Sequence, residues 1–82
     1  MTNHKIKAKE HNAKMANTLK FIRTDKRFTM RALADRLNTP HSFIGKTEKL
    51  DRRLDVGEFI QYCLALEANP VDVFKEIAKG VK

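Results

Sequence analysis

Several polar side chains near the middle of the chain are of types that contact nucleic acid. Lys46 can donate hydrogen bonds to the O6 and N7 atoms of guanine, a contact worth about 1–3 kcal/mol of discrimination between bases. His41 can donate to a base edge or accept from one, and Ser42 can do both with little selectivity. Arg52 and Arg53 place two adjacent positive charges, which hold phosphates without reading sequence. These residue types predict a surface that contacts nucleic acid.

Two short helices must position these side chains. Thr29 is a good N-cap for a helix over 30–37, whose apolar residues repeat on one face. Asn38 tolerates the left-handed conformation that ends a helix. Thr39 then caps a second helix over 40–49, which has proline at its first position. Because free N–H groups at helix starts suit phosphate oxygens, both threonines are predicted phosphate contacts.

Three residues have the spacing that a helix-turn-helix requires. Ala34 is small enough to let the two helices approach, Asn38 takes the turn, and Ile44 fills the space between them. Any pair of short helices could produce this pattern, so the spacing favours the motif without establishing it.

The rest of the chain also has helical patterns. Apolar residues at helical spacing predict a first helix that begins at Ala13. Asp55 and Glu58 form a capping-box pair that opens a fourth helix, and Gly80 ends a fifth. No alternating strand pattern occurs, so we expect an all-α fold of five helices.

The N-terminal two thirds of the chain are basic and the C-terminal third is acidic. The net charge of +7 comprises +6 over residues 1–27, +3 over 28–53 and −2 over 54–82. Such polarity suits a domain whose front meets a polyanion. We expect a basic N-terminal arm over 1–12, which is either flexible or the frayed start of a helix, and a helix-turn-helix domain over 13–80.

Length and composition exclude several function classes. The 82 residues allow one domain, and the single cysteine, Cys63, excludes an internal disulfide and is expected in the core. Three histidines make no zinc-ligand cluster, so no metal or cofactor is expected. No apolar run approaches the roughly 20 residues of a membrane span and no signal peptide is found, so we expect a cytoplasmic protein. No catalytic constellation indicates an enzyme.

Four groups of residues together match the pattern of a known family. They are Phe28-Thr29, Ala32-Leu33-Ala34, the run from Ser42 to Glu48, and Arg52-Arg53-Leu54-Asp55 followed by Glu58-Phe59. This pattern resembles the lambda repressor/Cro-like (Xre-type) family, especially a subgroup of small stand-alone regulators. The resemblance covers the chain from Leu19 to Phe74.

The resemblance implies a five-helix DNA-binding domain that acts as a homodimer on a palindromic operator. Its recognition helix corresponds to 40–49, and the residues implied to face the bases are His41, Ser42, Gly45 and Lys46. Together with the two capping threonines, Thr29 and Thr39, the residues expected to contact phosphates are Lys49, Arg52 and Arg53. The resemblance also implies a structural ion pair between Arg23 and Glu48.

Three residues depart from the family pattern. Met30 stands where the family usually has glutamine, so that side chain's hydrogen bond to a phosphate or to the recognition helix is lost. Gly45 lies within a helix, where glycine costs about 1 kcal/mol relative to alanine. It is either tolerated there or allows close approach to DNA. Leu50 occupies a loop position that is often glycine, which leaves the loop conformation open.

The expected function is regulation of transcription by a repressor that binds double-stranded DNA. The apolar surface left on the last two helices places the dimer interface near Glu67, Ala68, Val71 and Phe74. An antitoxin that represses its own operon, and an interaction module that does not bind DNA, remain alternatives. For a further protein partner, we expect a toxin if the protein is an antitoxin and RNA polymerase if it is a regulator of transcription.

Overall fold

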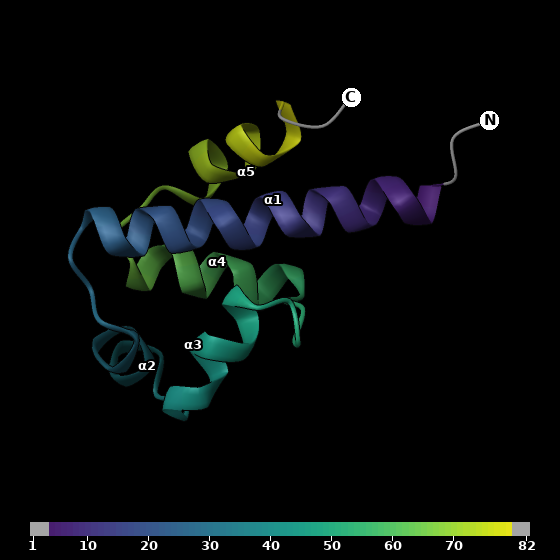
Figure 1. Cartoon of the computed structure of the whole chain (residues 1–82). Helices are drawn as coiled ribbons and strands as arrows, with labels where there is room; N and C mark the ends of the chain where they lie inside the picture. The colour runs from purple at the N-terminus through teal and green to yellow at the C-terminus, as the bar shows by residue number, and fades with distance from the viewer. Residues whose placement is uncertain (1–3, 80–82) are drawn as a thin grey trace.

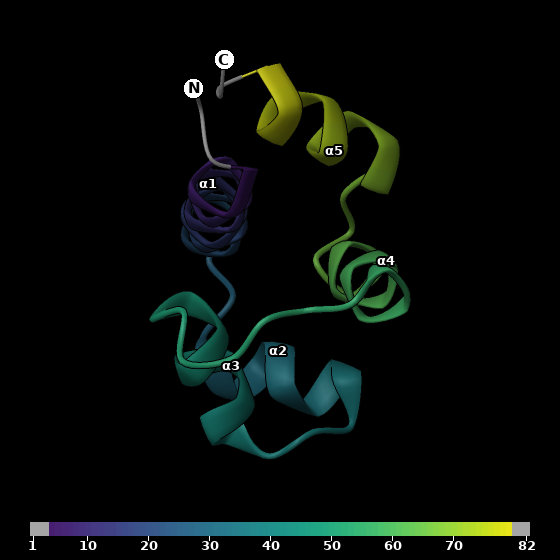
Figure 2. The same cartoon turned by 90° about the vertical axis from the view of Figure 1, so that its right-hand side faces the viewer.

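The computed structural model describes residues 4–79, which form five α-helices (Figure 1). They are α1 (His4–Asp25), α2 (Met30–Leu37), α3 (His41–Glu48), α4 (Val56–Ala65) and α5 (Pro70–Lys79). No strand occurs in this range, so the predicted all-α fold is confirmed. Figure 2 shows α2 and α3 at one end of the molecule and α5 at the other, with α1 and α4 between them. Residues 1–3 of the predicted arm and the predicted helix end at Gly80 lie outside the described residues.

The first helix is longer than its apolar pattern predicts. It begins at His4 rather than Ala13, so residues 4–12 of the predicted arm are helical. This segment contains no glycine or proline and has three lysines, which favour helix even without an apolar stripe. Lys7 and Glu10 add an ion pair of 3.6 Å, one turn apart.

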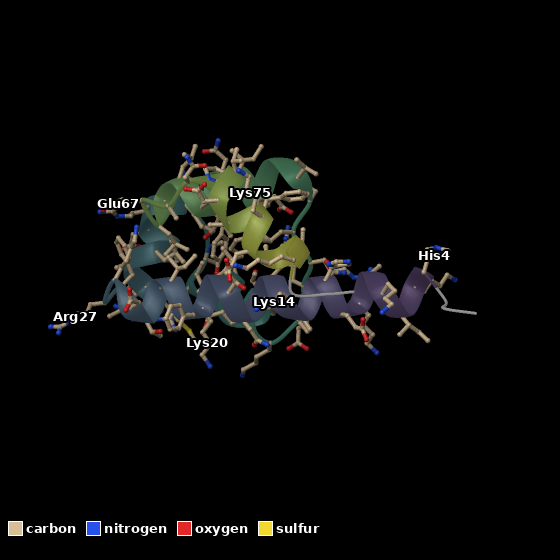
Figure 3. The ribbon with its side chains drawn as sticks, turned by 90° about the horizontal axis from the view of Figure 1, so that it is seen from above. His4, Lys14, Lys20, Arg27, Glu67 and Lys75 are labelled. Atoms are coloured by element: carbon tan, nitrogen blue, oxygen red, sulfur yellow. The ribbon has the colours of Figure 1, made fainter. Side chains whose placement is uncertain are left out.

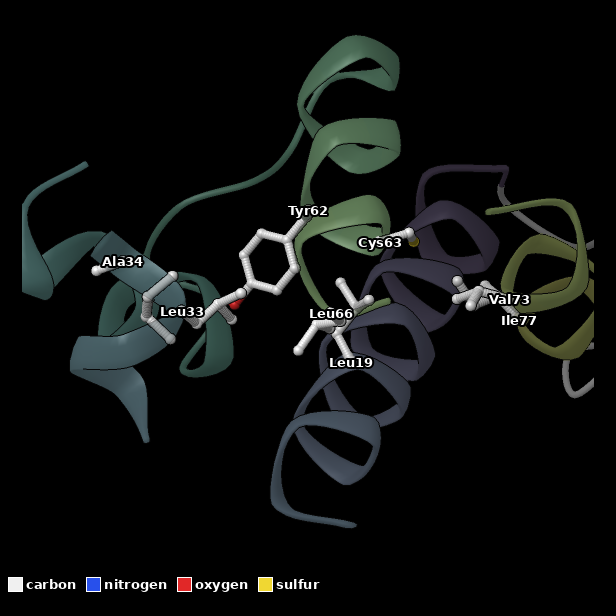
Figure 4. Close-up of a cluster of buried hydrophobic side chains, with 9 residues drawn as sticks. Leu19, Leu33, Ala34, Tyr62, Cys63, Leu66, Val73 and Ile77 are labelled. Atoms are coloured by element: carbon white, nitrogen blue, oxygen red, sulfur yellow. The ribbon is translucent and has the colours of Figure 1, made fainter. Parts of the chain in front are cut away.

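The core is apolar and receives side chains from all five helices (Figure 4). Its buried members are Leu19, Leu33, Ala34, Ile44, Tyr62, Cys63, Leu66, Val73 and Ile77. Burial raises the pKa of the Cys63 thiol to about 11, which keeps it protonated and unreactive. The buried residues of α1 begin at Ala16, so the first turns of this helix extend beyond the core (Figure 1).

Each of the first four helices ends in the same left-handed turn. The residues in the turns are Arg27, Asn38, Leu50 and Glu67, with φ values of 63°, 54°, 64° and 59°. In each turn the next residue donates its N–H to a carbonyl five residues earlier, as Thr39 does to Ala34 at 3.0 Å, which is the pairing of a Schellman motif. The left-handed turn predicted at Asn38 is confirmed. At the other three positions the side chain costs about 1–2 kcal/mol that glycine would avoid.

Two predicted helix starts are confirmed. The hydroxyl oxygen of Thr29 accepts a hydrogen bond from the N–H of Ala32 at 3.0 Å, which caps α2. Asp55 and Glu58 form a complete capping box at the start of α4, because each side chain accepts from the other's backbone N–H at 2.7 and 3.0 Å. Both caps act over three residues, which is why the sequence alone reveals them.

The start of α3 differs from the prediction. Pro40 is the N-cap and the helix begins at His41, because the ψ angle of Pro40 is extended at 148°. The prediction that Thr39 caps this helix is therefore wrong. The Thr39 hydroxyl lies 3.5 Å from the carbonyl oxygen of Ala34, so it contacts the end of α2 instead. α3 is one residue shorter at each end than the predicted recognition helix.

Candidate nucleic-acid interface

The helices α2 and α3 pack against each other as a helix-turn-helix. Ala34 and Ile44, which are 1% and 0% exposed, meet in the core, and Asn38 forms the left-handed turn between the helices. Thr47 is buried on the same side of α3 as Ile44, and its hydroxyl donates to the carbonyl of Phe43 at 2.8 Å. The inner face of α3 is therefore held by packing, and all its buried polar side chains have partners.

The outer face of α3 is polar. His41, Ser42 and Lys46 are exposed, Gly45 is half-buried, and Lys49 is exposed just beyond the helix end. Residues three and four positions apart lie on one face of a helix, so these positions form a continuous surface away from the core. The structure thus brings the four predicted base-contact residues together. A helix face of exposed hydrogen-bonding groups has the form that fits a DNA major groove.

A buried ion pair joins α1 to the end of α3. The Nε and Nη2 atoms of Arg23 donate to the two carboxylate oxygens of Glu48 at 2.5 and 3.1 Å, and Nη1 donates to the carbonyl of Phe28 at 2.8 Å. The two side chains are 10% and 4% exposed. Two-point pairing and the extra backbone partner compensate charges whose burial is otherwise costly. The pair fixes the orientation of α3 on the bundle.

Arg52 has intramolecular partners that the sequence did not reveal. Its Nη1 and Nη2 atoms donate to the Glu58 carboxylate at 3.2 and 2.6 Å, and its guanidinium lies 4.6 Å from the centre of the Phe43 ring. The hydrogen bond from Arg52 lowers the pKa of Glu58, as does the backbone N–H of Asp55, and the same pairing raises the pKa of Arg52. The loop after α3 is therefore organised around Arg52, whereas the side chain of Arg53 is exposed.

The remaining predicted phosphate contacts lie in different environments. Thr29 is exposed at the start of α2, whereas Thr39 is half-buried in the turn before α3. Lys5 and Lys9, which lie in the predicted basic arm and were not assigned as phosphate contacts, line one groove together with Arg53. Their spacing of four residues places both on one helix face, but only the folded chain brings that face to the loop after α3.

The four residues predicted at a dimer interface differ in exposure. Val71 and Phe74 on α5 are 59% and 63% exposed, which is unusual for large apolar side chains. Ala68 is half-buried, and Glu67 accepts a hydrogen bond from Arg36 of α2 at 2.9 Å. The predicted interface did not include three other exposed apolar residues, which lie on one face of α4: Val56, Ile60 and Leu64.

Comparison with known proteins gives matches among solved structures, whereas no family model and no curated protein matches the chain. The restriction-modification controller protein C.Esp1396I is 26% identical over 84% of this chain and 88% of its own, with a TM-score of 0.77. The clp gene regulator ClgR from C. glutamicum is 24% identical over 85% and 91%, with a TM-score of 0.77, and shares the fold.

A third solved structure is more similar to the chain. An XRE-family like protein from Pseudomonas syringae pv. tomato str. DC3000 is 30% identical over 94% of both chains, with a TM-score of 0.89. Within residues 4–79, none of the helices combines the length and apolar character needed to cross a membrane. Because the 30% identity to the Pseudomonas syringae protein extends over nearly the whole of both chains and includes the helix-turn-helix, the chain belongs to the XRE family of helix-turn-helix regulators.

Proposed function

We propose that this protein is a transcription regulator that binds double-stranded DNA in a sequence-specific manner and represses genes next to its operator. The observation that carries the proposal is the exposed polar face of α3, held rigidly by the core and by the Arg23–Glu48 pair. Rigid support matters because base readout depends on hydrogen-bond geometry. Similarity to a gene regulator and to a restriction-modification controller supports the regulator class.

Base readout is assigned to His41, Ser42 and Lys46 on α3, with Gly45 between them. Phosphate contacts are assigned to the N-terminal end of α2 at Thr29, to the turn before α3 at Thr39, and to the loop after α3. In that loop Lys49 and Arg53 are exposed, and Arg52 keeps one face of its guanidinium on an aromatic ring. These contacts would hold the register in which α3 meets the base pairs.

We further propose that the protein acts as a homodimer on a palindromic operator. The exposed apolar residues of α5, Val71 and Phe74, together with Glu67 and Ala68, are the surface we assign to the second copy. Apolar side chains at this exposure favour burial against a partner. A two-fold dimer predicts two half-sites whose centres are about 34–36 Å apart, or a multiple of one helical turn.

Selection of bound duplexes from a random pool tests this function. Wild-type protein should enrich one sequence with two inverted half-sites at the spacing given above. Lys46→Ala should relax the preference at one base position in each half-site by about 1–3 kcal/mol. Lys75→Ala, which removes an exposed lysine from α5, is the matched control and should enrich the wild-type sequence. Enrichment of no sequence by the wild type would overturn the proposal.

Gly45 provides a second and sharper test. A Cβ added at this position would meet no atom within 4 Å, so packing within the protein does not require glycine. Gly45→Ala should therefore raise the free energy of unfolding by up to about 1 kcal/mol through helix propensity. If the α3 backbone closely approaches DNA, the same change should weaken operator binding. A variant that is more stable and also binds DNA as tightly as wild type would exclude close approach at this position.

A further inference from the structure

A basic groove lies between the first turns of α1 and the loop that follows α3. Its lining consists of Lys5, Ala8, Lys9 and Asn12 from α1, and Leu50 and Arg53 from the loop. Three of these residues are positively charged and none is acidic. All three basic side chains are exposed. The fold thus gathers cations from two distant segments around one concave surface.

The core does not account for the position of the first turns of α1. The fully buried residues of this helix begin at Ala16, beyond the groove. The one acidic residue of the segment, Glu10, pairs with Lys7, and neither lines the groove. Because like charges repel, gathering them on one surface raises the free energy of the isolated protein, and a bound polyanion lowers it.

The loop side of the groove is hydrogen-bonded to the candidate recognition helix, α3. The carbonyl of Lys46 in the last turn of α3 accepts hydrogen bonds from the N–H groups of Asp51 and Arg52 at 2.9 and 3.3 Å. Leu50 and Arg53 flank these two residues, so the loop side of the groove is fixed to α3. The loop side of the groove, which carries Arg53, therefore moves together with α3.

We propose that this groove binds backbone phosphates of the same DNA duplex, next to the base pairs that α3 contacts, an inference which rests on the proposed function. Lys5 and Lys9 add phosphate contacts that lengthen the footprint along the backbone. These contacts carry no sequence information, because they engage phosphate oxygens alone. They raise affinity and its salt dependence, and they leave the preferred sequence unchanged.

The test compares two variants that lose the same charge. Lys5→Gln/Lys9→Gln removes two groove charges and keeps helix propensity, since glutamine and lysine are nearly equal in this respect. Lys14→Gln/Lys75→Gln is the control. Lys14 lines a different groove, between α1 and α5, and Lys75 lies on α5, at the end of the molecule away from α3 (Figures 2 and 3). Light scattering of both variants shows whether either change alters oligomeric state.

Binding is measured by fluorescence anisotropy on the selected duplex, extended by a helical turn at each side, between about 50 and 200 mM salt. Lys5→Gln/Lys9→Gln should lower the slope of log affinity against log salt by about two for each protomer, or about four for the proposed dimer, and weaken binding at least about tenfold at the lower salt. The control should keep the wild-type slope. Phosphate ethylation should weaken wild-type binding at positions next to the α3 base pairs and lose that effect in the groove variant.

The outcomes of these measurements distinguish a failure of the groove proposal from a failure of the proposed DNA-binding function of α3. In one outcome the wild type binds a specific sequence while Lys5→Gln/Lys9→Gln keeps the wild-type slope of log affinity against log salt. That result would overturn the groove proposal and leave the regulator proposal intact. An equal loss of slope in both variants would also overturn it, because the effect would then follow net charge rather than position. Failure of the wild type to bind any duplex would overturn both proposals.

Discussion

Two arginine–glutamate pairs near the end of α3 have similar geometry but different surroundings. Arg23 and Glu48 join two helices distant in sequence, and their side chains are 10% and 4% exposed. Arg52 and Glu58 join a loop to the start of the next helix, and theirs are 39% and 32% exposed. In each pair two guanidinium nitrogens donate to two carboxylate oxygens. Burial, rather than hydrogen-bond count, distinguishes them.

The difference indicates separate roles. A buried pair is costly to break, because the remaining charge loses its partner in a place that water cannot reach. An exposed pair is replaced by water with little cost. We therefore expect the Arg23–Glu48 pair to hold the tertiary position of α3. The Arg52–Glu58 pair shapes the loop that carries candidate phosphate contacts, where a charged ligand can compete for the arginine.

The largest predicted effect comes from breaking the buried pair. Glu48→Gln leaves Arg23 without a counter-charge and should lower the free energy of unfolding by about 3–5 kcal/mol. Urea unfolding followed by circular dichroism measures the loss. The double change Arg23→Met/Glu48→Leu should recover part of it, since no buried charge remains, although the Phe28 carbonyl loses its donor. A loss for Glu48→Gln no larger than for Glu58→Gln would contradict the distinction between the pairs.

A smaller, pH-dependent effect is predicted for the Arg52–Glu58 pair, which is the more exposed of the two. The pKa of Glu58 is lowered in the folded protein, so its contribution is present above the ordinary glutamate pKa of about 4.3 and is lost as pH falls through the lower folded value. Wild type should therefore lose more stability than Glu58→Gln between pH 5 and the acid limit. Urea midpoints across this range measure the difference. Parallel curves for the two proteins would show that Glu58 does not contribute.

The smallest predicted effect concerns Tyr62, whose ring is fully buried beside the first pair. Burial raises the pKa of its phenol, and the charge of Glu48 adds to the shift. Within the described residues its hydroxyl has no hydrogen-bond partner. Tyr62→Phe should therefore raise the free energy of unfolding by up to about 1 kcal/mol, measured by urea unfolding. A clear loss would show instead that the hydroxyl supports the carboxylate of Glu48.

Local signals in the sequence predicted much of the fold. The cap at Thr29, the capping box of Asp55 and Glu58, and the left-handed turn at Asn38 all depend on contacts within a few residues. The spacing of Ala34, Asn38 and Ile44 depends on one helix pair. Such signals are visible in the sequence because the interacting groups are near neighbours along the chain.

Other turns and helix ends were not predictable in this way. The first turns of α1 lack the apolar stripe that marks a helix, and helix propensity together with the Lys7–Glu10 ion pair favours them instead. Arg27, Leu50 and Glu67 adopt a conformation that their side chains disfavour, because the Schellman hydrogen bonds and the packing of the helices on either side require it. The sequence carries no glycine or asparagine there to signal the turn.

The sequence by itself determined the five helices, their apolar faces and the polar residues of α3, because propensity, capping and periodicity act over one or two turns. The tertiary structure alone decided which distant side chains meet. It placed Arg52 on Glu58 and Phe43, and it brought the α1 lysines to Arg53. The physical reason is that such contacts depend on the path of the whole chain, which packing of the core sets and no short stretch of sequence encodes.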